Sequence, residues 1–343
     1  MKDVSLTKEN MIKHKVSNET YMTLYMLFVL FVIIVVASLF VPTFLSIGTF
    51  LNILAQQSYL IIMGIGVTFL LLTGNFDLSV GSVASCAAVL SVFFCQPLEG
   101  SASSLGMNNG WGLSVPAAMI LALLVCLGIG AINALFIVRY KIASVIVTLG
   151  TLYISRGIAQ VVAQGANRNL GLPDSFSRLG DTTVGPLGLP VVIMLVGVAI
   201  ALIVEKGTVF GRRMYHIGAN RDAAVISGIK VNKQLTSLYL ISALLSGFTG
   251  LIIASKFKSG SSYAANGYEF DALAAAILGG TSILGGFGSI VSLLIGVFIL
   301  GIISTCLNQM GFQPATQTIF KGIILVIAVI AQRVGISRRS RKL

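Results

Sequence analysis

Long apolar runs separated by short polar segments make up most of the chain. A helix needs roughly 20 apolar residues to cross a bilayer, and most of these runs approach that length. The runs occupy residues 21–41, 54–73, 78–96, 115–138, 143–163, 187–204, 235–255, 270–284, 290–309 and 316–332. This pattern predicts an all-α polytopic membrane protein of about ten transmembrane helices, some of them short or broken. The count stays open, because the second and eighth runs could be re-entrant.

The first run, residues 21–41, is longer than the apolar core of a signal peptide and lacks a small-residue cleavage site. It therefore predicts a first transmembrane helix. We expect three parts along the chain: a cytosolic amino-terminal segment (1–20), a single transmembrane domain (21–333) and a basic cytosolic tail (334–343).

The most polar segment between the two ends of the chain is residues 205–233. Within it, residues 211–229 read GRRMYHIGANRDAAVISGI. Asn220 can accept a hydrogen bond from backbone amides at a helix start, Asp222 suits the positive end of the helix dipole, and Gly228 is suited to end a helix. These signals predict one short helix, residues 221–227, which is below the length that is stable in isolation.

That short helix is expected to expose Ala223, Ala224, Val225 and Ile226 to the cytosol. An exposed apolar patch on a marginal helix suggests a docking partner. An amphipathic loop lying on lipid headgroups explains the same pattern, so the residues alone leave both interpretations open.

Two glycine-rich segments interrupt the apolar runs. Residues 74–82 read GNFDLSVGS and residues 279–288 read GGTSILGGFG. A broken helix in lipid must have its freed backbone groups buried in protein or lining a wet cavity, and in transporters such breaks often flank the substrate route. Candidate residues of a substrate pathway are therefore Asn75, Asp77, Ser79, Asp271, Gly279, Gly280 and Thr281.

Asp77 has two interpretations. It could cap a helix that begins at Leu78, or it could hydrogen-bond a polar solute or hold the joint in a gating conformation. Residues 74–78 and 267–273 also share a faint similarity, GNFDL against GYEFDAL. By the order of the runs these two joints face opposite sides of the membrane, as an inverted repeat requires.

Composition and charge narrow the class of protein. Of 343 residues, 56% are hydrophobic and 10% charged, which excludes a soluble domain. The net charge of +12 lies between and beyond the apolar runs, which indicates the positive-inside rule with both termini cytoplasmic, and no nucleic acid as partner. Lys256 and Lys258 break this rule, although Glu269 and Asp271 are close by in sequence. Neither histidine has ligand-spaced companions, so no metal site is expected.

The chain lacks the motifs of a self-sufficient pump or enzyme. No G-x-x-x-x-G-K-[ST] loop is present to bind ATP, and neither H-E-x-x-H nor a serine nucleophile elbow occurs. Active transport would therefore draw its energy from another chain or from an ion gradient. In the second case the chain would be a secondary transporter with Asp77 or Asp271 as a proton or sodium site.

Four segments resemble the membrane permeases of simple-sugar ABC importers, the ribose, xylose and galactose type. GNFDLSVGS at 74–82 is similar to the family's GGIDLSVGS, with Asn75 and Phe76 as departures. GYEFDALAA at 267–275 is similar to GYELDAIAA, and LGGTS with GGFG at 278–288 is similar to a following glycine motif. FGR at 210–212, GAN at 218–220, AA at 223–224 and SGI at 227–229 are similar to the family's cytosolic coupling loop.

The resemblance implies a permease subunit in a bacterial inner membrane, with membrane lipid around it. It implies a homo- or heterodimer around one route, an ABC ATPase subunit whose cleft receives residues 221–227, and an extracytoplasmic sugar-binding protein. ATP and Mg²⁺ would be bound by the ATPase, and this chain would hold no cofactor. The solute stays open among sugars and related small polar molecules. The residues that the resemblance assigns to ATPase coupling are Gly211, Arg212, Gly218, Asn220, Arg221, Asp222, Ala223, Ala224, Ile226 and Gly228.

Overall fold

The computed structural model describes residues 23–97, 110–165, 167–169, 171–323 and 326. Helices are joined by loops, and the described residues also form a small antiparallel pair of strands, β1 (Thr183–Val184) and β2 (Leu187–Gly188). The longer helices are α2 (Ile47–Leu72), α3 (Val80–Cys95), α4 (Val115–Ala134), α5 (Ser144–Ala163), α7 (Leu189–Leu202), α10 (Val231–Phe257) and α12 (Ile290–Gln309). The shorter elements are η2 (Leu135–Arg139), η3 (Asp174–Ser177), α6 (Arg178–Asp181), η4 (Ile203–Gly207), α8 (Val209–Ala219), α9 (Arg221–Ile226) and α11 (Tyr268–Leu278).

Seven of the described helices are long and apolar enough to cross a bilayer, by length and composition. They are Thr23–Phe40, Ile47–Leu72, Val115–Arg139, Ser144–Ala163, Leu189–Gly207, Val231–Phe257 and Ile290–Gln309. The prediction of an all-α polytopic membrane protein is confirmed. The count of ten stays a prediction, because α3 and α11 are shorter and the tenth run is described as a helix only over residues 314–323 and at residue 326.

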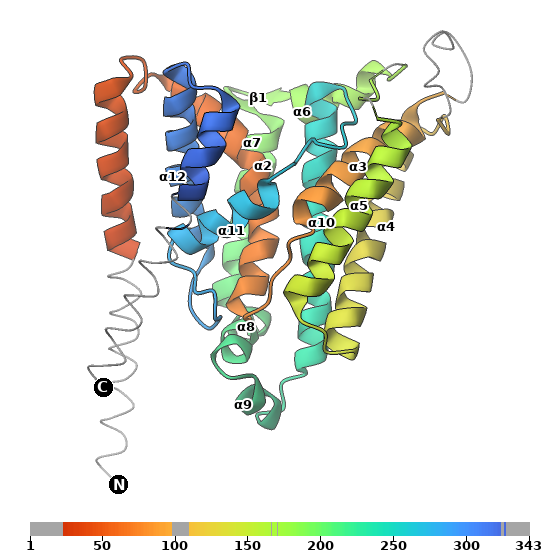
Figure 1. Cartoon of the computed structure of the whole chain (residues 1–343), viewed down its shortest axis with the longest axis vertical. Helices are drawn as coiled ribbons and strands as arrows, with labels where there is room; N and C mark the ends of the chain where they lie inside the picture. The colour runs from red at the N-terminus through yellow and green to blue at the C-terminus, as the bar shows by residue number, and fades with distance from the viewer. Residues whose placement is uncertain (1–22, 98–109, 166, 170, 324–325, 327–343) are drawn as a thin grey trace.

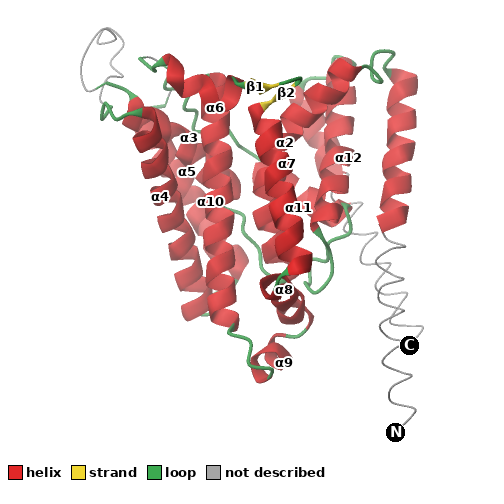
Figure 2. Cartoon of the chain, turned by 180° about the vertical axis from the view of Figure 1, so that it is seen from behind, coloured by secondary structure: helices red, strands yellow, loops and turns green. Residues whose placement is uncertain are grey.

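The helices form one bundle around α2, α3 and α10 (Figure 1). α10 packs against α2, α3 and α4, and the helix Thr23–Phe40 stands at the edge of the bundle, with little of it buried. Seen from behind, α4 and α10 lie on one flank and α12 on the other (Figure 2). The outer helices expose large apolar side chains such as Ile120, Tyr153 and Ile200, as a surface that faces lipid must.

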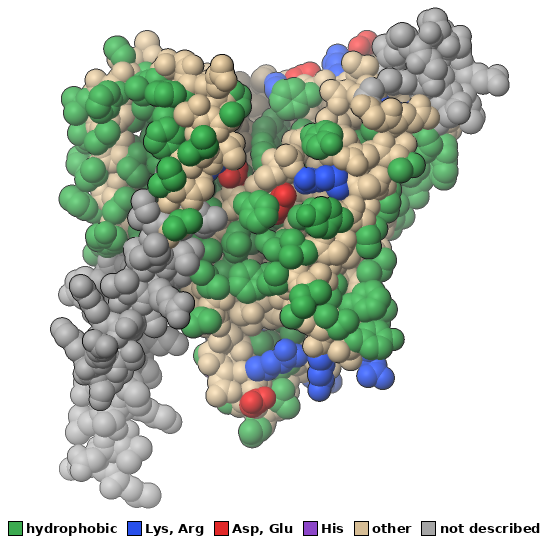
Figure 3. All heavy atoms as spheres, viewed as in Figure 1, with side chains coloured by type: hydrophobic (Ala, Val, Ile, Leu, Met, Phe, Trp, Pro, Cys, Tyr) green, Lys and Arg blue, Asp and Glu red, His purple; other side chains and the backbone are tan. Residues whose placement is uncertain are grey.

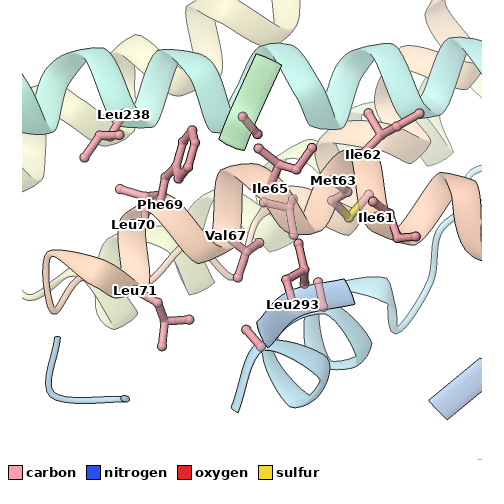
Figure 4. Close-up of a cluster of buried hydrophobic side chains, with 14 of the residues drawn as sticks. Ile61, Ile62, Met63, Ile65, Val67, Phe69, Leu70, Leu71, Leu238 and Leu293 are labelled. Atoms are coloured by element: carbon pink, nitrogen blue, oxygen red, sulfur yellow. The ribbon is translucent and has the colours of Figure 1, made fainter. Parts of the chain in front are cut away.

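The centre of the bundle is a dry apolar core. Side chains of α2 from Ile61 to Leu71 pack with Leu238 of α10 and Leu293 of α12 (Figure 4). Glycine lets the backbones approach: a Cβ atom at Gly250 of α10 would lie 2.0 Å from the carbonyl oxygen of Ala84 in α3. Because lipid is as apolar as these side chains, close packing of this kind is what holds membrane helices together.

Two helices begin inside the protein rather than at a surface. α3 has 16 residues, about 24 Å, and α11 has 11 residues. The segments that lead into them, residues 73–79 and 258–267, enter from opposite ends of the bundle (Figure 1). The two helix starts then meet, since a Cβ atom at Gly81 would lie 2.6 Å from the carbonyl oxygen of Ala265. This is the arrangement that an inverted repeat requires.

Several predicted boundaries were wrong. The second run is a full-length helix of 26 residues and is not re-entrant; the short helices are the third and the eighth. α3 begins at Val80 rather than Leu78, and α11 ends at Leu278, so residues 279–289 form a loop instead of helix. The polar segment 205–233 starts within η4 and ends within α10. The ninth run matches α12 from its first residue to its last.

We call the end of the molecule formed by α8, α9, residues 73–74 and residues 279–289 the α9 end. Lys and Arg side chains gather there (Figure 3). At the opposite end, Lys256 contacts Asp181 at 3.1 Å and Lys258 contacts Asp174 at 3.9 Å. The partners of these lysines are therefore not Glu269 and Asp271, the acids close to them in sequence. The segments 1–20 and 334–343 lie outside the described residues, so the three-part division of the chain stays a prediction.

Candidate functional site

The polar segment that precedes α10 folds into two helices rather than one. Thr208 caps α8, because its Oγ1 accepts a hydrogen bond from the amide of Gly211 at 3.1 Å. The backbone is extended at Asn220, whose Oδ1 accepts a hydrogen bond from the amide of Ala223 at 2.9 Å and so caps α9. Gly228 has φ +79°, as expected for the residue that ends a short helix. The predicted helix and its cap are confirmed, and α8 was missed.

α9 projects from the bundle at the α9 end (Figure 1). Its apolar residues divide between two environments: Ile226 is 87% exposed and Val225 is 56% exposed, whereas Ala224 is buried in the core. The expectation that Ala224 faces the cytosol was therefore wrong, and an arginine there would disturb packing instead of testing a contact. Arg212, Asn220, Arg221, Asp222, Ala223 and Gly228 are exposed with Ile226.

Two of the glycines that were predicted to take part in coupling serve close packing. A Cβ atom at Gly211 would lie 2.0 Å from the carbonyl oxygen of Glu205. At Gly218 it would lie 1.9 Å from the carbonyl oxygen of Leu72 and 2.4 Å from the amide nitrogen of Gly286. Neither glycine can be replaced without moving backbone. α8 is thus wedged between the end of α2 and the loop between α11 and α12.

A buried glutamate strengthens this junction. Glu205 is 2% exposed; its Oε1 accepts a hydrogen bond from the hydroxyl of Tyr215 and its Oε2 accepts one from the amide of Ile290, both at 2.8 Å. The hydroxyl of Tyr215 also lies 2.8 Å from the carbonyl oxygen of Gly288. These contacts tie α8 to the start of α12. Sequence reasoning missed Glu205, and its one signal is an acidic residue at the end of an apolar run.

Asp77 lies in the joint between α2 and α3 and is 4% exposed. Its Oδ1 accepts hydrogen bonds from the amide of Ser79 at 3.0 Å and the hydroxyl of Ser79 at 2.6 Å, and its Oδ2 accepts one from Ser242 of α10 at 2.7 Å. The residue at the helix boundary is Ser79, so Asp77 is not the cap itself. It fixes the turn before α3 and fastens that turn to α10.

The joint is held on other sides as well. Asn133 of α4 donates a hydrogen bond to the hydroxyl of Ser79 at 3.1 Å and accepts one from Thr151 of α5 at 2.8 Å. Tyr239 of α10 donates to the carbonyl oxygen of Phe76 at 3.2 Å. Polar groups of α4 and α10 therefore bond to a segment that lies between two helices, as a break within a membrane demands.

We expect Asp77→Asn to impair transport more than it lowers the amount of protein in the membrane. The asparagine can still accept from Ser79, but the charge-assisted bonds weaken by about 1 kcal/mol each, which loosens the joint. Immunoblots and solute uptake on the same cells measure the two effects. Asp174→Asn, at the exposed first residue of η3 at the opposite end, is the control. A fall in abundance that accounts for the whole loss of uptake would contradict a role beyond folding.

A cavity of about 600 Å³ separates the joint from α9. Asn75 and Phe76 line it from the joint, and Arg221, Asp222 and Val225 line it from α9. Of the predicted pathway residues, only Asn75 therefore lies beside the predicted coupling helix. Its side chain bonds back to Thr73, at 3.2 Å from the carbonyl oxygen and 3.1 Å from the hydroxyl.

The first turn of α11 carries two carboxylates that pair with different helices. Glu269 is 3% exposed, and its Oε1 lies 3.6 Å from the guanidinium of Arg156 in α5. Asp271 contacts Lys321 of the segment 314–323 at 2.6 Å. On this face, acidic and basic side chains lie beside each other midway along the molecule (Figure 3). Both acids lie in the first turn of α11, and their partners, which are distant in the chain, were not identified from the sequence.

Gly279, Gly280 and Thr281 are closely packed in this structure, and their place in a substrate pathway stays a prediction. A Cβ atom at Gly279 would lie 1.6 Å from the carbonyl oxygen of Ser292, Gly280 has φ +104°, and the side chain of Thr281 is buried. They form the tight turn that follows α11 and let it pack on α12. Among the described residues, no group of three or more His, Cys, Asp or Glu side chains could hold a metal ion.

The chain matches one protein family and is similar to several known proteins over most of its length. A model of the family described as "Branched-chain amino acid transport system / permease component" matches residues 49–329. "Ribose import permease protein RbsC" of Bacillus subtilis (strain 168) is 36% identical over 301 residues, covering 88% of this chain and 89% of that protein. "Galactose/methyl galactoside import permease protein MglC" of Escherichia coli (strain K12) is 32% identical over 306 residues, covering 87% and 90%. No solved structure matches.

Proposed function

The chain belongs to this family of transport permeases, and we propose that it forms the membrane route of an ABC importer for a monosaccharide or a similar small polar solute. It is a translocation subunit and not an enzyme. The solute class comes from the ribose and galactose relatives and from no single residue of this chain. The family description names amino acid transport. The proposal of a sugar therefore depends on the individual relatives and not on the family as a whole.

The observation that carries the proposal is α9. This helix has six residues and exposes Ile226 and Val225 at the positively charged end of the molecule. Packing within the chain does not explain the exposure of these two apolar side chains, which suggests a docking partner. Its cap and its buried Ala224 hold it in one orientation. These features suit insertion into a cleft on an ATPase subunit, which would bind ATP and Mg²⁺. We therefore place the α9 end in the cytoplasm, with both termini on that side.

The opposite end is where an extracytoplasmic sugar-binding protein would dock. A second permease copy or a paralogue would complete the route, and the surrounding lipid would contact the exposed apolar side chains of α4, α5 and α7. The residues we assign to ATPase coupling are the exposed ones of α9 together with Arg212. Gly211 and Gly218 are assigned to the packing that transmits movement.

The ion-coupled alternative is disfavoured by the relatives and by the two candidate carboxylates. Both oxygens of Asp77 accept hydrogen bonds from Ser79 or Ser242, and Asp271 pairs with Lys321. At Asp77 a cation would have to displace these donors, and at Asp271 it would be repelled by the ammonium group of Lys321. Neither carboxylate is therefore poised to bind and release an ion in each cycle.

Replacing residues 221–227 by a Gly/Ser linker should abolish co-purification of an ATPase subunit with this chain. The linker removes the capped helix and with it the orientation of Ile226. The experiment expresses the chain with candidate ATPase subunits of the same genome and recovers complexes through a tag on this chain. Native α9 should retain one ATPase and the linker should retain none. If neither form binds an ATPase, and the chain alone in liposomes moves solute down an ion gradient, the importer is excluded.

A further inference from the structure

A polar cavity of about 270 Å³ lies between α2, α10, α11, α12 and the segment 314–323. It occupies the half of the bundle nearer the opposite end, because it is reached by the early residues of α2, such as Gln56, and by Phe257 at the end of α10. Pockets for drug-sized ligands have volumes of about 300–1,000 Å³. The volume here suits one smaller molecule.

The lining carries polar groups that the protein leaves unused. Within the described part of the chain, the side chains of Gln56, Tyr59, Tyr268 and Ser304 make no hydrogen bond to protein, although all four line the cavity. Tyr59 is 9% exposed. Gln56 is exposed and Tyr268 and Ser304 are partly exposed, so these donors and acceptors are available to water or to a solute in the cavity.

The charge of the cavity is balanced. Asp271 and Lys321 form an ion pair at 2.6 Å, and both residues line the wall. The contact occupies Oδ2 of Asp271 and leaves its Oδ1 available to another donor. The wall combines one carboxylate, one ammonium group, three amides and three hydroxyls. Such a wall favours a neutral solute rich in hydroxyl groups, because each hydroxyl can donate or accept a hydrogen bond. The apolar faces of Tyr59 and Tyr268 suit the C–H faces of a sugar ring.

We propose that this cavity holds one monosaccharide during transport, contacted by Gln56, Tyr59, Tyr268, Asp271 and Ser304. The inference rests on the proposed function and adds to it the place in the chain where the solute is bound. It assigns Asp271 alone, of the residues that the sequence indicated for a pathway, to direct contact with the solute. It also makes the pairing of Lys321 with Asp271 part of the site.

Cysteine protection in the complete importer tests the proposal. Ser304→Cys is made in a Cys306→Ser background, where the remaining native cysteines, Cys86, Cys95 and Cys126, are buried. Right-side-out membrane vesicles are treated with a methanethiosulfonate reagent, with and without D-ribose or D-galactose. Thr183→Cys, in the exposed hairpin at the same end of the molecule, is the matched control.

The transported sugar should slow labelling at position 304 by about tenfold at ten times its dissociation constant and leave labelling at position 183 unchanged. Adding Gln56→Leu should remove this protection while cysteine 304 still reacts. The importer could take up a sugar in an ATP-dependent way although that sugar gives no protection at position 304, or gives equal protection at positions 304 and 183. This result would overturn the assignment of the cavity as the sugar site and leave the proposed function intact. Uptake of neither sugar overturns the proposed substrate class and this inference together.

Discussion

Ile226→Glu should reduce solute uptake to the level of cells without the permease. Ile226 is 87% exposed at the tip of α9 and makes no core contact, so the substitution should leave the bundle and the amount of protein unchanged. In the docked complex, however, the carboxylate would be buried in an apolar cleft without a partner. Losing the apolar contact and burying a charge together cost about 3–5 kcal/mol, which is enough to remove most of the complex at cellular concentrations.

The matched control is Ile226→Leu, which keeps an apolar side chain of the same size and should keep uptake. Co-purification with the ATPase subunit and an immunoblot of the membrane fraction separate docking from folding. Uptake at the native level by Ile226→Glu would sink the assignment of α9 as the docking helix. A variant absent from the membrane would show instead that Ile226 contributes to folding.

Gly218→Ala should lower uptake by about 5- to 150-fold while the ATPase subunit still co-purifies. The added Cβ atom would lie 1.9 Å from the carbonyl oxygen of Leu72 and 2.4 Å from the amide nitrogen of Gly286. Both neighbours are backbone, so α8 must move away from the end of α2 or from the loop before α12. Overpacking costs about 1–3 kcal/mol, and a coupling energy of that size corresponds to the expected range of uptake.

Gly207→Ala is the control for this prediction. At Gly207 a Cβ atom would meet only Cγ2 of Ile203, at 3.8 Å, which is an ordinary contact. The two substitutions make the same chemical change at neighbouring places in the chain, so a difference between them reports on the junction of α8. Equal uptake by the two variants would mean that this junction does not transmit movement.

The parts of the fold that the sequence predicted depend on local signals. Apolar run length gave the long helices, and the cap at Asn220 with Gly228 gave α9, because each signal lies within a few residues of the feature. The errors lie where distant segments decide. α3 begins at Val80 because Asp77 and Ser79 are held by Ser242 and Asn133, and no local pattern identifies those partners.

The burial of individual side chains was equally hard to predict from the sequence. Arg168 lies in a polar loop but is only 2% exposed; it donates to Gln96 at 2.7 Å, 72 residues away in the chain, and lies 5.0 Å from the centre of the Phe93 ring. Ala224 could not be told from Ala223 in the sequence, although one is buried and the other exposed. In both cases contacts with distant segments decide whether the side chain is buried. A loop has no periodic pattern to reveal such contacts, and the six residues of α9 are too few to show one.

The separation between the exposed tip of α9 and the glycine packing of α8 has an evolutionary consequence. Gly218, Gly285 and Gly286 leave almost no freedom for substitution, because backbone meets backbone there. Val225 and Ile226 are exposed, so a substitution there leaves the packing within the chain unchanged. If α9 docks on an ATPase subunit as proposed, changes at a few exposed residues of α9 could adapt the permease to a different ATPase subunit. The packing of α8 would stay unchanged. Duplicated importers could thus diverge in partner choice before they diverge in mechanism.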